Sequence, residues 1–183
     1  TLFNELEAWT KLYFLGGSSS WANLRGLLTN NIRGLQLHEE GSFRSPRADV
    51  WGISDKSLFL EANEILARQT KPFFAVIQTA NNHRPYTIPA EDRPFLPGDV
   101  HSEAELREAG FESQEELDAF RYTDFTFKAF IEAARKTDYY DETLFVFIGD
   151  HGIGGNAGKR FPESWTSRSL TSFHVPLLFY APR

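Results

Sequence analysis

Residues Thr143–Gly152 read Thr-Leu-Phe-Val-Phe-Ile-Gly-Asp-His-Gly, and this stretch decides the predicted fold. The apolar run Leu144–Ile148 ends abruptly at a glycine, which is typical of a strand buried on both faces within a parallel sheet. In open α/β sheets, ligands bind just outside the carboxyl ends of such strands. We therefore expect this strand to deliver Asp150 and His151 to a ligand site.

The pair Asp150-His151 also has the chemistry of a metal site. A carboxylate oxygen next to an imidazole nitrogen suits manganese or zinc. Glycines on both sides, Gly149 and Gly152, let the backbone turn sharply and leave room for a ligand. The alternative is a tight turn in which Asp150 caps the next element and His151 is merely exposed. Taken alone, the four residues leave both interpretations open.

Strand and helix patterns alternate along the rest of the chain. Strands are expected at residues 11–15, 34–38, 73–79 and 174–180, and helices at 21–28, 56–68 and 113–136. Ser54 or Asp55 can cap the second of these helices, and Ser-Gln-Glu-Glu at 113–116 predicts a capping box for the third. Residues 87–110 are rich in proline and charge and are expected to form a long surface loop. The alternation predicts an α/β fold with a mainly parallel sheet sandwiched by helices.

Composition narrows the class of protein. A chain of 183 residues with 41% apolar residues is long enough for about one domain with a proper core. The net charge of −6, without a basic stripe, argues against nucleic-acid binding. Cysteine is absent, which excludes disulfides, a thiolate nucleophile and a cysteine-based zinc site. The apolar runs are too short to span a bilayer.

An ordered set of motifs resembles the alkaline phosphatase/sulfatase superfamily, and more narrowly its lipoteichoic acid synthase and phosphoglycerol transferase branch. Their order along nearly the whole chain carries the resemblance, since no single motif decides it. In chain order the motifs are Tyr13-Phe14-Leu15-Gly16-Gly17, Trp51-Gly52-Ile53-Ser54-Asp55, Asn82-His83-Arg84-Pro85-Tyr86, Arg121-Tyr122-Thr123-Asp124, Tyr140-Asp141-Glu142-Thr143-Leu144, Gly149-Asp150-His151-Gly152 and His174-Val175-Pro176-Leu177-Leu178.

The resemblance implies a metal-assisted group transfer through a covalent enzyme intermediate, which water or an acceptor alcohol then resolves. Asp150 and His151 match the family's C-terminal metal ligands. His83 matches a histidine that lies by the substrate phosphate and assists the leaving oxygen. Trp51 lies where this branch places a substrate-contacting tryptophan, and His174 where relatives often carry a basic residue that faces the site. The implied cofactor is one divalent ion, manganese first, with zinc, magnesium or calcium as alternatives.

The chain also departs from the family pattern. The family's N-terminal part supplies an acidic metal ligand and the nucleophile, and neither is recognisable here. Residues 1–183 are therefore expected to be the C-terminal portion of one sulfatase-like catalytic domain, inactive alone. In the family this portion follows membrane helices and faces outward, which implies an extracytoplasmic location at the cell membrane. An anionic glycerolipid or glycan is the implied substrate, with no nucleic-acid partner.

Three functional hypotheses follow. The first is the transfer of a phosphoglycerol-type group, and the second is the hydrolysis of a sulfuric or phosphoric ester within the same superfamily. They differ in the acceptor, which is an alcohol in one and water in the other. The third is a degenerate sulfatase-like module that binds a glycan or a partner without catalysis. The combination of Asp150, His151 and His83 favours an enzyme.

Overall fold

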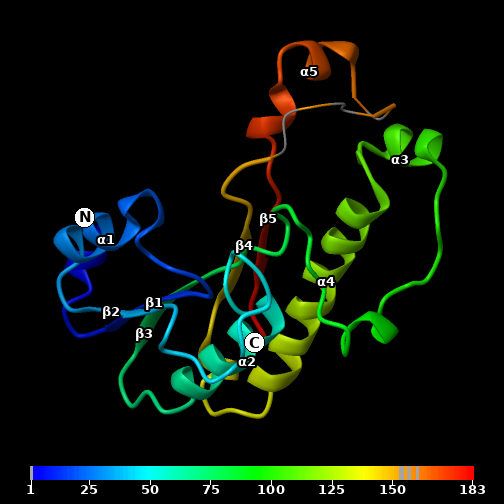
Figure 1. The fold of residues 1–183 in the computed structure, drawn as a ribbon. Coiled ribbons are helices and arrows are strands. Elements are labelled where there is room, and N and C mark those ends of the chain that lie inside the picture. The colour runs from blue at the N-terminus through cyan, green and yellow to red at the C-terminus, as the bar shows by residue number, and fades with distance from the viewer. Residues whose placement is uncertain (1, 153–154, 156–157, 160) are drawn as a thin grey trace.

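The computed structural model describes residues 2–152, 155, 158–159 and 161–183 (Figure 1). The described strands are β1 (Thr10–Leu15), β2 (Leu35–His38), β3 (Phe73–Gln78), β4 (Phe145–Ile148) and β5 (Leu177–Tyr180). The α-helices are α1 (Leu24–Asn31), α2 (Asp55–Leu66), α3 (Glu103–Ala109), α4 (Gln114–Ala134) and α5 (Glu163–Ser167). Short 3-10 helices are η1 (Leu2–Glu5), η2 (Trp21–Asn23), η3 (Arg93–Phe95), η4 (Tyr140–Glu142) and η5 (Leu170–Phe173).

A parallel sheet in the order β2-β1-β3 forms the first half of the fold. Alternate residues of β1 point to opposite faces, so Leu12 and Phe14 are buried together and pack against Leu58 and Ala62 of α2. The opposite face, which includes Tyr13, lies against η1 and α1. The predicted α/β fold, a parallel sheet flanked by helices, is confirmed.

The prediction for the strand before Asp150 was wrong in two respects. Strand β4 pairs with β5 in antiparallel orientation, and its side chains alternate in burial. Phe145 is buried in the cluster with Phe59 and Phe130, whereas Val146 and Ile148 are 47% and 65% exposed. A continuous apolar run predicts two covered faces, but α2 and α4 cover only one face of this strand in the part of the chain described here.

The last strand also differs from its prediction. It begins at Leu177 rather than at residue 174, and the side chains of residues 177–179 are all more than half exposed. In the described part of the chain β5 pairs with β4 alone, and only Tyr180 of its four residues is partly buried. Its role in the fold is to hold β4 through the antiparallel ladder, with Tyr180 packed at the edge of the α2–α4 cluster.

Helices α2 and α4 pack against each other (Figure 1). Helix α2 contacts β1 and β3, and Phe59 of α2 and Phe130 of α4 pack against Phe145 of β4. Ser54 caps α2 by accepting a hydrogen bond from the backbone N–H of Ser57, as predicted. Ser113 likewise caps α4, but the predicted capping box is absent there, because the Glu116 carboxylate accepts from the N–H of Glu112 instead. A complete box occurs at Ser102 and the residue three positions later, at the start of α3.

The stretch 87–110, predicted as a surface loop, contains η3 and α3 and is tied to the helical layer through Asp92. This carboxylate is buried, accepts a hydrogen bond from the Tyr122 hydroxyl of α4 at 2.9 Å, and forms an ion pair with Lys56 of α2. The Lys56 ammonium also lies 5.4 Å from the centre of the Phe125 ring. None of the helices in the described part of the chain is long and apolar enough to cross a membrane.

Candidate active site

Aromatic rings from separate loops meet at the carboxyl ends of the strands. The rings of Trp51 and His83 stack with centroids 4.7 Å apart and planes 28° apart. His83, after β3, and His151, after β4, lie 5.8 Å apart between ring centroids. Trp21, which the sequence analysis did not single out, meets Trp51 edge-on at 6.1 Å. The structure therefore brings together three of the residues chosen from the sequence.

Asp150 lies at the same edge of the fold. Its Oδ1 accepts a hydrogen bond from the backbone N–H of His151 at 2.9 Å. Burial raises the pKa of the Tyr13 hydroxyl, and the negative charge of Asp150 raises that pKa further. Tyr13 donates to Oε1 of Gln78 at 2.5 Å. Neither Tyr13 nor Gln78 was chosen as a site residue from the sequence, although Tyr13 opens the first motif of the family resemblance and Gln78 ends β3.

The donor atoms of Asp150 and His151 fit a divalent metal ion in kind. Nδ1 of His151 lies 2.9 Å from the carbonyl oxygen of Gly152. Because a carbonyl can only accept, this contact holds the proton on Nδ1 and leaves the Nε2 lone pair for a metal. Within the described ranges, no group of three or more His, Cys, Asp or Glu side chains is placed to hold an ion. A divalent ion takes about four or more ligands, so these two side chains could make up only part of a coordination shell.

His174 is not brought into this group. Its ring packs against Phe161 at 5.5 Å and Trp165 at 5.1 Å between centroids. Among the described residues, no ring contact joins His174 to Trp51, His83 or His151. The residue is exposed and ends η5 rather than opening a buried strand. Its predicted contact with the substrate stays a prediction.

Asp55 supports the loop that carries His83. Its buried carboxylate accepts hydrogen bonds from the backbone N–H groups of Ala80 at 2.9 Å and Asn81 at 3.1 Å. In addition, Oδ1 of the Asn81 side chain accepts a hydrogen bond from the backbone N–H of Asp55 at 2.7 Å. The sequence predicts either Ser54 or Asp55 as the N-cap of α2. In the structure Ser54 is the cap, and Asp55 joins the first turn of the helix to the end of β3.

The burial of the Asp55 carboxyl group predicts that the stability of the protein depends on pH. Burial raises the pKa of Asp55 to about 6, although its two backbone hydrogen bonds oppose the shift. The folded protein then binds this proton more tightly than the unfolded chain, so the contribution of Asp55 to the unfolding free energy falls as pH rises from about 4 to about 6. The fall is about 3 kcal/mol.

Urea unfolding of the wild type and of Asp55→Asn at several pH values between 4 and 7 measures this effect. The wild-type stability relative to the variant should decline by that amount across the range, because the amide does not titrate. A constant difference between the two proteins would show that Asp55 titrates alike in the folded and unfolded states.

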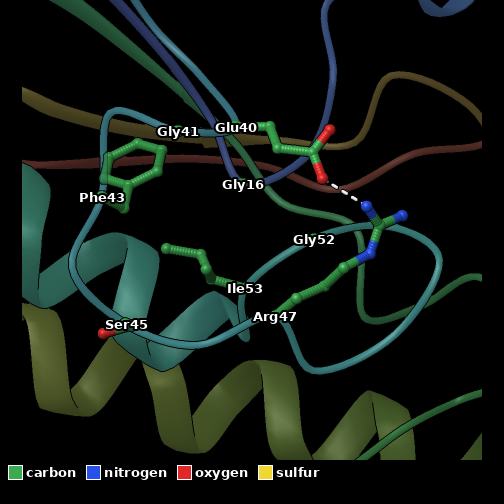
Figure 2. A pocket seen from close by; sticks show the side chains of 8 residues that line it. All are labelled: Gly16, Glu40, Gly41, Phe43, Ser45, Arg47, Gly52 and Ile53. Carbon is green, nitrogen blue, oxygen red and sulfur yellow. Dashed lines mark hydrogen bonds and ion pairs between the residues drawn. The ribbon is translucent and has the colours of Figure 1, made fainter.

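A small cavity of about 120 Å³ is lined in part by Gly52 and Ile53, which follow Trp51 in the chain (Figure 2). None of the predicted site residues lines it. Figure 2 shows Arg47 and Glu40 directed toward one another as an ion pair. Arg47 also donates to the carbonyl oxygens of Asp49 at 2.6 Å and Val50 at 2.7 Å. The cationic side chain at the cavity is thus engaged in holding the loop that leads into Trp51.

The chain is similar to known proteins in both sequence and fold. The Sulfatase family profile matches residues 12–183. A lipoteichoic acid synthase from Staphylococcus saprophyticus is 30% identical over 112 residues, which are 59% of this chain and 16% of that protein. The solved lipoteichoic acid synthase from Listeria monocytogenes has a TM-score of 0.76 and 19% identity over 99% of this chain and 45% of its own.

A phosphoglycerol transferase from Streptococcus pyogenes, solved with sn-glycerol-1-phosphate, has the same fold. It gives a TM-score of 0.55 and 19% identity over 94% of this chain and 43% of its own. The chain therefore spans less than half the length of each of these three proteins. Because the family match extends over nearly all of its residues, the chain belongs to the Sulfatase family, within the alkaline phosphatase superfamily.

Proposed function

We propose that this chain is part of an enzyme that transfers a phosphoglycerol-type group from an anionic lipid or glycan, through a covalent intermediate. The observation that carries the proposal is the meeting of Asp150-His151 with His83 at the carboxyl ends of β4 and β3, with ring centroids 5.8 Å apart. The similarity to lipoteichoic acid synthases supports phosphoester transfer as the reaction class. The nucleophile is proposed to lie outside residues 1–183.

The residues of the site would have separate roles. Asp150 and His151 would hold one divalent ion, manganese first, together with ligands from outside this chain. When bound, such an ion polarises the nucleophile and neutralises charge on the transferred phosphoryl group. His83 would lie beside that group and give a proton to the leaving oxygen as a general acid. His83 is exposed, and its ring contacts Trp51 and His151.

The location follows from the same proposal. We place the catalytic site on the outer side of the cell membrane, where a lipid headgroup can reach it. Anchoring would come from membrane helices outside residues 1–183. The chain's net charge of −6 is compatible with a lipid or glycan substrate and does not favour nucleic acid.

His83→Ala tests the assignment of the acid. In the full-length gene product loaded with Mn²⁺, release of diacylglycerol from phosphatidylglycerol vesicles should fall about 100-fold, because a positioned general acid contributes at least that much. Metal content by elemental analysis should be unchanged. Loss of the metal would mean that His83 is a ligand instead, and unchanged turnover would remove it from the mechanism.

The choice of acceptor separates transfer from hydrolysis. If glycerol added to the reaction is incorporated into a phosphoglycerol product, an alcohol resolves the intermediate. If glycerol 1-phosphate is released at the same rate with or without an added alcohol, water is the acceptor. The second result would favour the ester hydrolase that the family match also admits.

A further inference from the structure

We propose that Trp51 is a positioning residue that acts through His83, rather than a residue that binds the substrate. The proposal rests on the proposed function in one respect, which is that His83 acts as the general acid. The family resemblance predicts a substrate-contacting tryptophan at this place. The contacts of the indole point to a different task, which is to orient the ring of His83 and hold its loop.

The indole makes two contacts with successive residues of one loop. Its face stacks on the His83 ring, with centroids 4.7 Å apart. Its Nε1–H, the one hydrogen-bond donor of the side chain, donates to the carbonyl oxygen of Arg84 at 2.7 Å. The first contact sets the plane of the imidazole, and the second fixes the backbone that carries it. The polar group of Trp51 is therefore engaged within the protein.

Trp51 is itself rigidly placed, as a positioning residue must be. Its backbone N–H donates to Oδ1 of Asp49 at 2.7 Å. The Trp51 carbonyl lies so close to Gly17 that a Cβ built there would be 2.3 Å from the carbonyl oxygen. Gly52 has a φ of +113°, and a Cβ on it would lie 2.0 Å from the carbonyl oxygen of Gly16. The backbone at Trp51 and Gly52 is thus docked onto the turn after β1, where the Ile53 N–H also donates to the carbonyl oxygen of Gly16 at 3.2 Å.

The other hydrogen bonds described for the His83 loop involve its backbone or the side chains of Asn82 and Arg84, not the imidazole. The His83 N–H donates to the carbonyl oxygen of Ala80 at 3.0 Å, and the Tyr86 N–H donates to that of His83 at 2.9 Å. The described ring contacts of His83 are those with Trp51 and His151. Since His83 is exposed, loss of the indole leaves its ring free to change rotamer. Trp51 therefore determines where the His83 nitrogens point.

A double-mutant cycle in the full-length, Mn²⁺-loaded gene product tests the proposal. With phosphatidylglycerol vesicles as substrate, Trp51→Ala should lower kcat about 10- to 100-fold, as loss of a residue that orients a catalytic group does, with little change in KM. Trp51→Phe, which keeps a stacking face, should recover most of kcat. In a His83→Ala background, Trp51→Ala should cost less than about 2-fold. A raised KM, or an equal loss in both backgrounds, would overturn the proposal in favour of direct substrate contact.

Hydrogen exchange provides a readout that does not depend on turnover. In Trp51→Ala, the amides of His83 and Tyr86 should exchange faster, while the amides of α4 keep their protection and show that the fold is intact. Trp21→Ala is the matched control, because that indole touches Trp51 only edge-on, and it should leave the loop unchanged. Absent turnover in the wild type would count against the proposed function alone. Unchanged exchange of the loop in Trp51→Ala would overturn the positioning role.

Discussion

Replacing Asp150 with alanine in the full-length gene product should remove its stoichiometric Mn²⁺ and lower turnover by roughly 10³-fold or more, because metal stabilisation of transition-state charge amounts to several kcal/mol. His151→Ala should do the same. Both side chains follow β4 directly, and the geometry of the His151 ring leaves Nε2 for coordination. Elemental analysis and steady-state kinetics on the same samples measure the two effects together.

Asp141→Ala is a suitable control for this experiment. Asp141 is an exposed carboxylate in η4, before β4, and it pairs with Arg183. Its removal should leave both metal and turnover in place, since a surface ion pair contributes little. Full turnover in Asp150→Ala without bound metal would contradict the metal-dependent mechanism. Stoichiometric metal in both Asp150→Ala and His151→Ala would place the metal site elsewhere.

The second large effect concerns stability. Asp92→Ala should lower the free energy of unfolding by about 3–5 kcal/mol, the range for breaking a buried ion pair by removing one partner. The change leaves the Lys56 ammonium without its carboxylate and the Tyr122 hydroxyl without its acceptor. Tyr122 is fully buried, and burial raises the pKa of its hydroxyl, so the group stays neutral and requires a hydrogen-bond partner.

Two further variants test whether the loss of stability comes from the Asp92 contacts themselves. Tyr122→Phe removes one hydrogen bond and keeps the ion pair, so its cost should be about 1–3 kcal/mol. Glu91→Ala removes an exposed neighbouring carboxylate and should change stability by less than about 0.5 kcal/mol. Urea unfolding at neutral pH measures all three. A cost of Asp92→Ala no larger than that of Glu91→Ala would show that the Asp92 network does not contribute to the fold.

Local patterns in the sequence were sufficient to locate most elements. The apolar runs at β1 and β3 and the helical period of α2 depend on residues a few positions apart, so the chain itself specifies them. The same local logic placed His83 after β3 and Asp150-His151 after β4, at strand ends that share one edge of the fold. Their proximity, 5.8 Å between the two imidazole rings, depends on how the two separate sheets pack, because β3 and β4 are not neighbours in one sheet.

Tertiary structure alone decided the rest, because burial and partner choice depend on segments far apart in the chain. A run such as Phe145–Ile148 looks the same whether one face or two are covered, and only the packing of α2, α4 and β5 made β4 an antiparallel strand with an exposed face. The ring of His174 likewise went to Trp165 rather than to the site. The stacking of Trp51 on His83 joins residues from two loops, and no local spacing encodes such a contact.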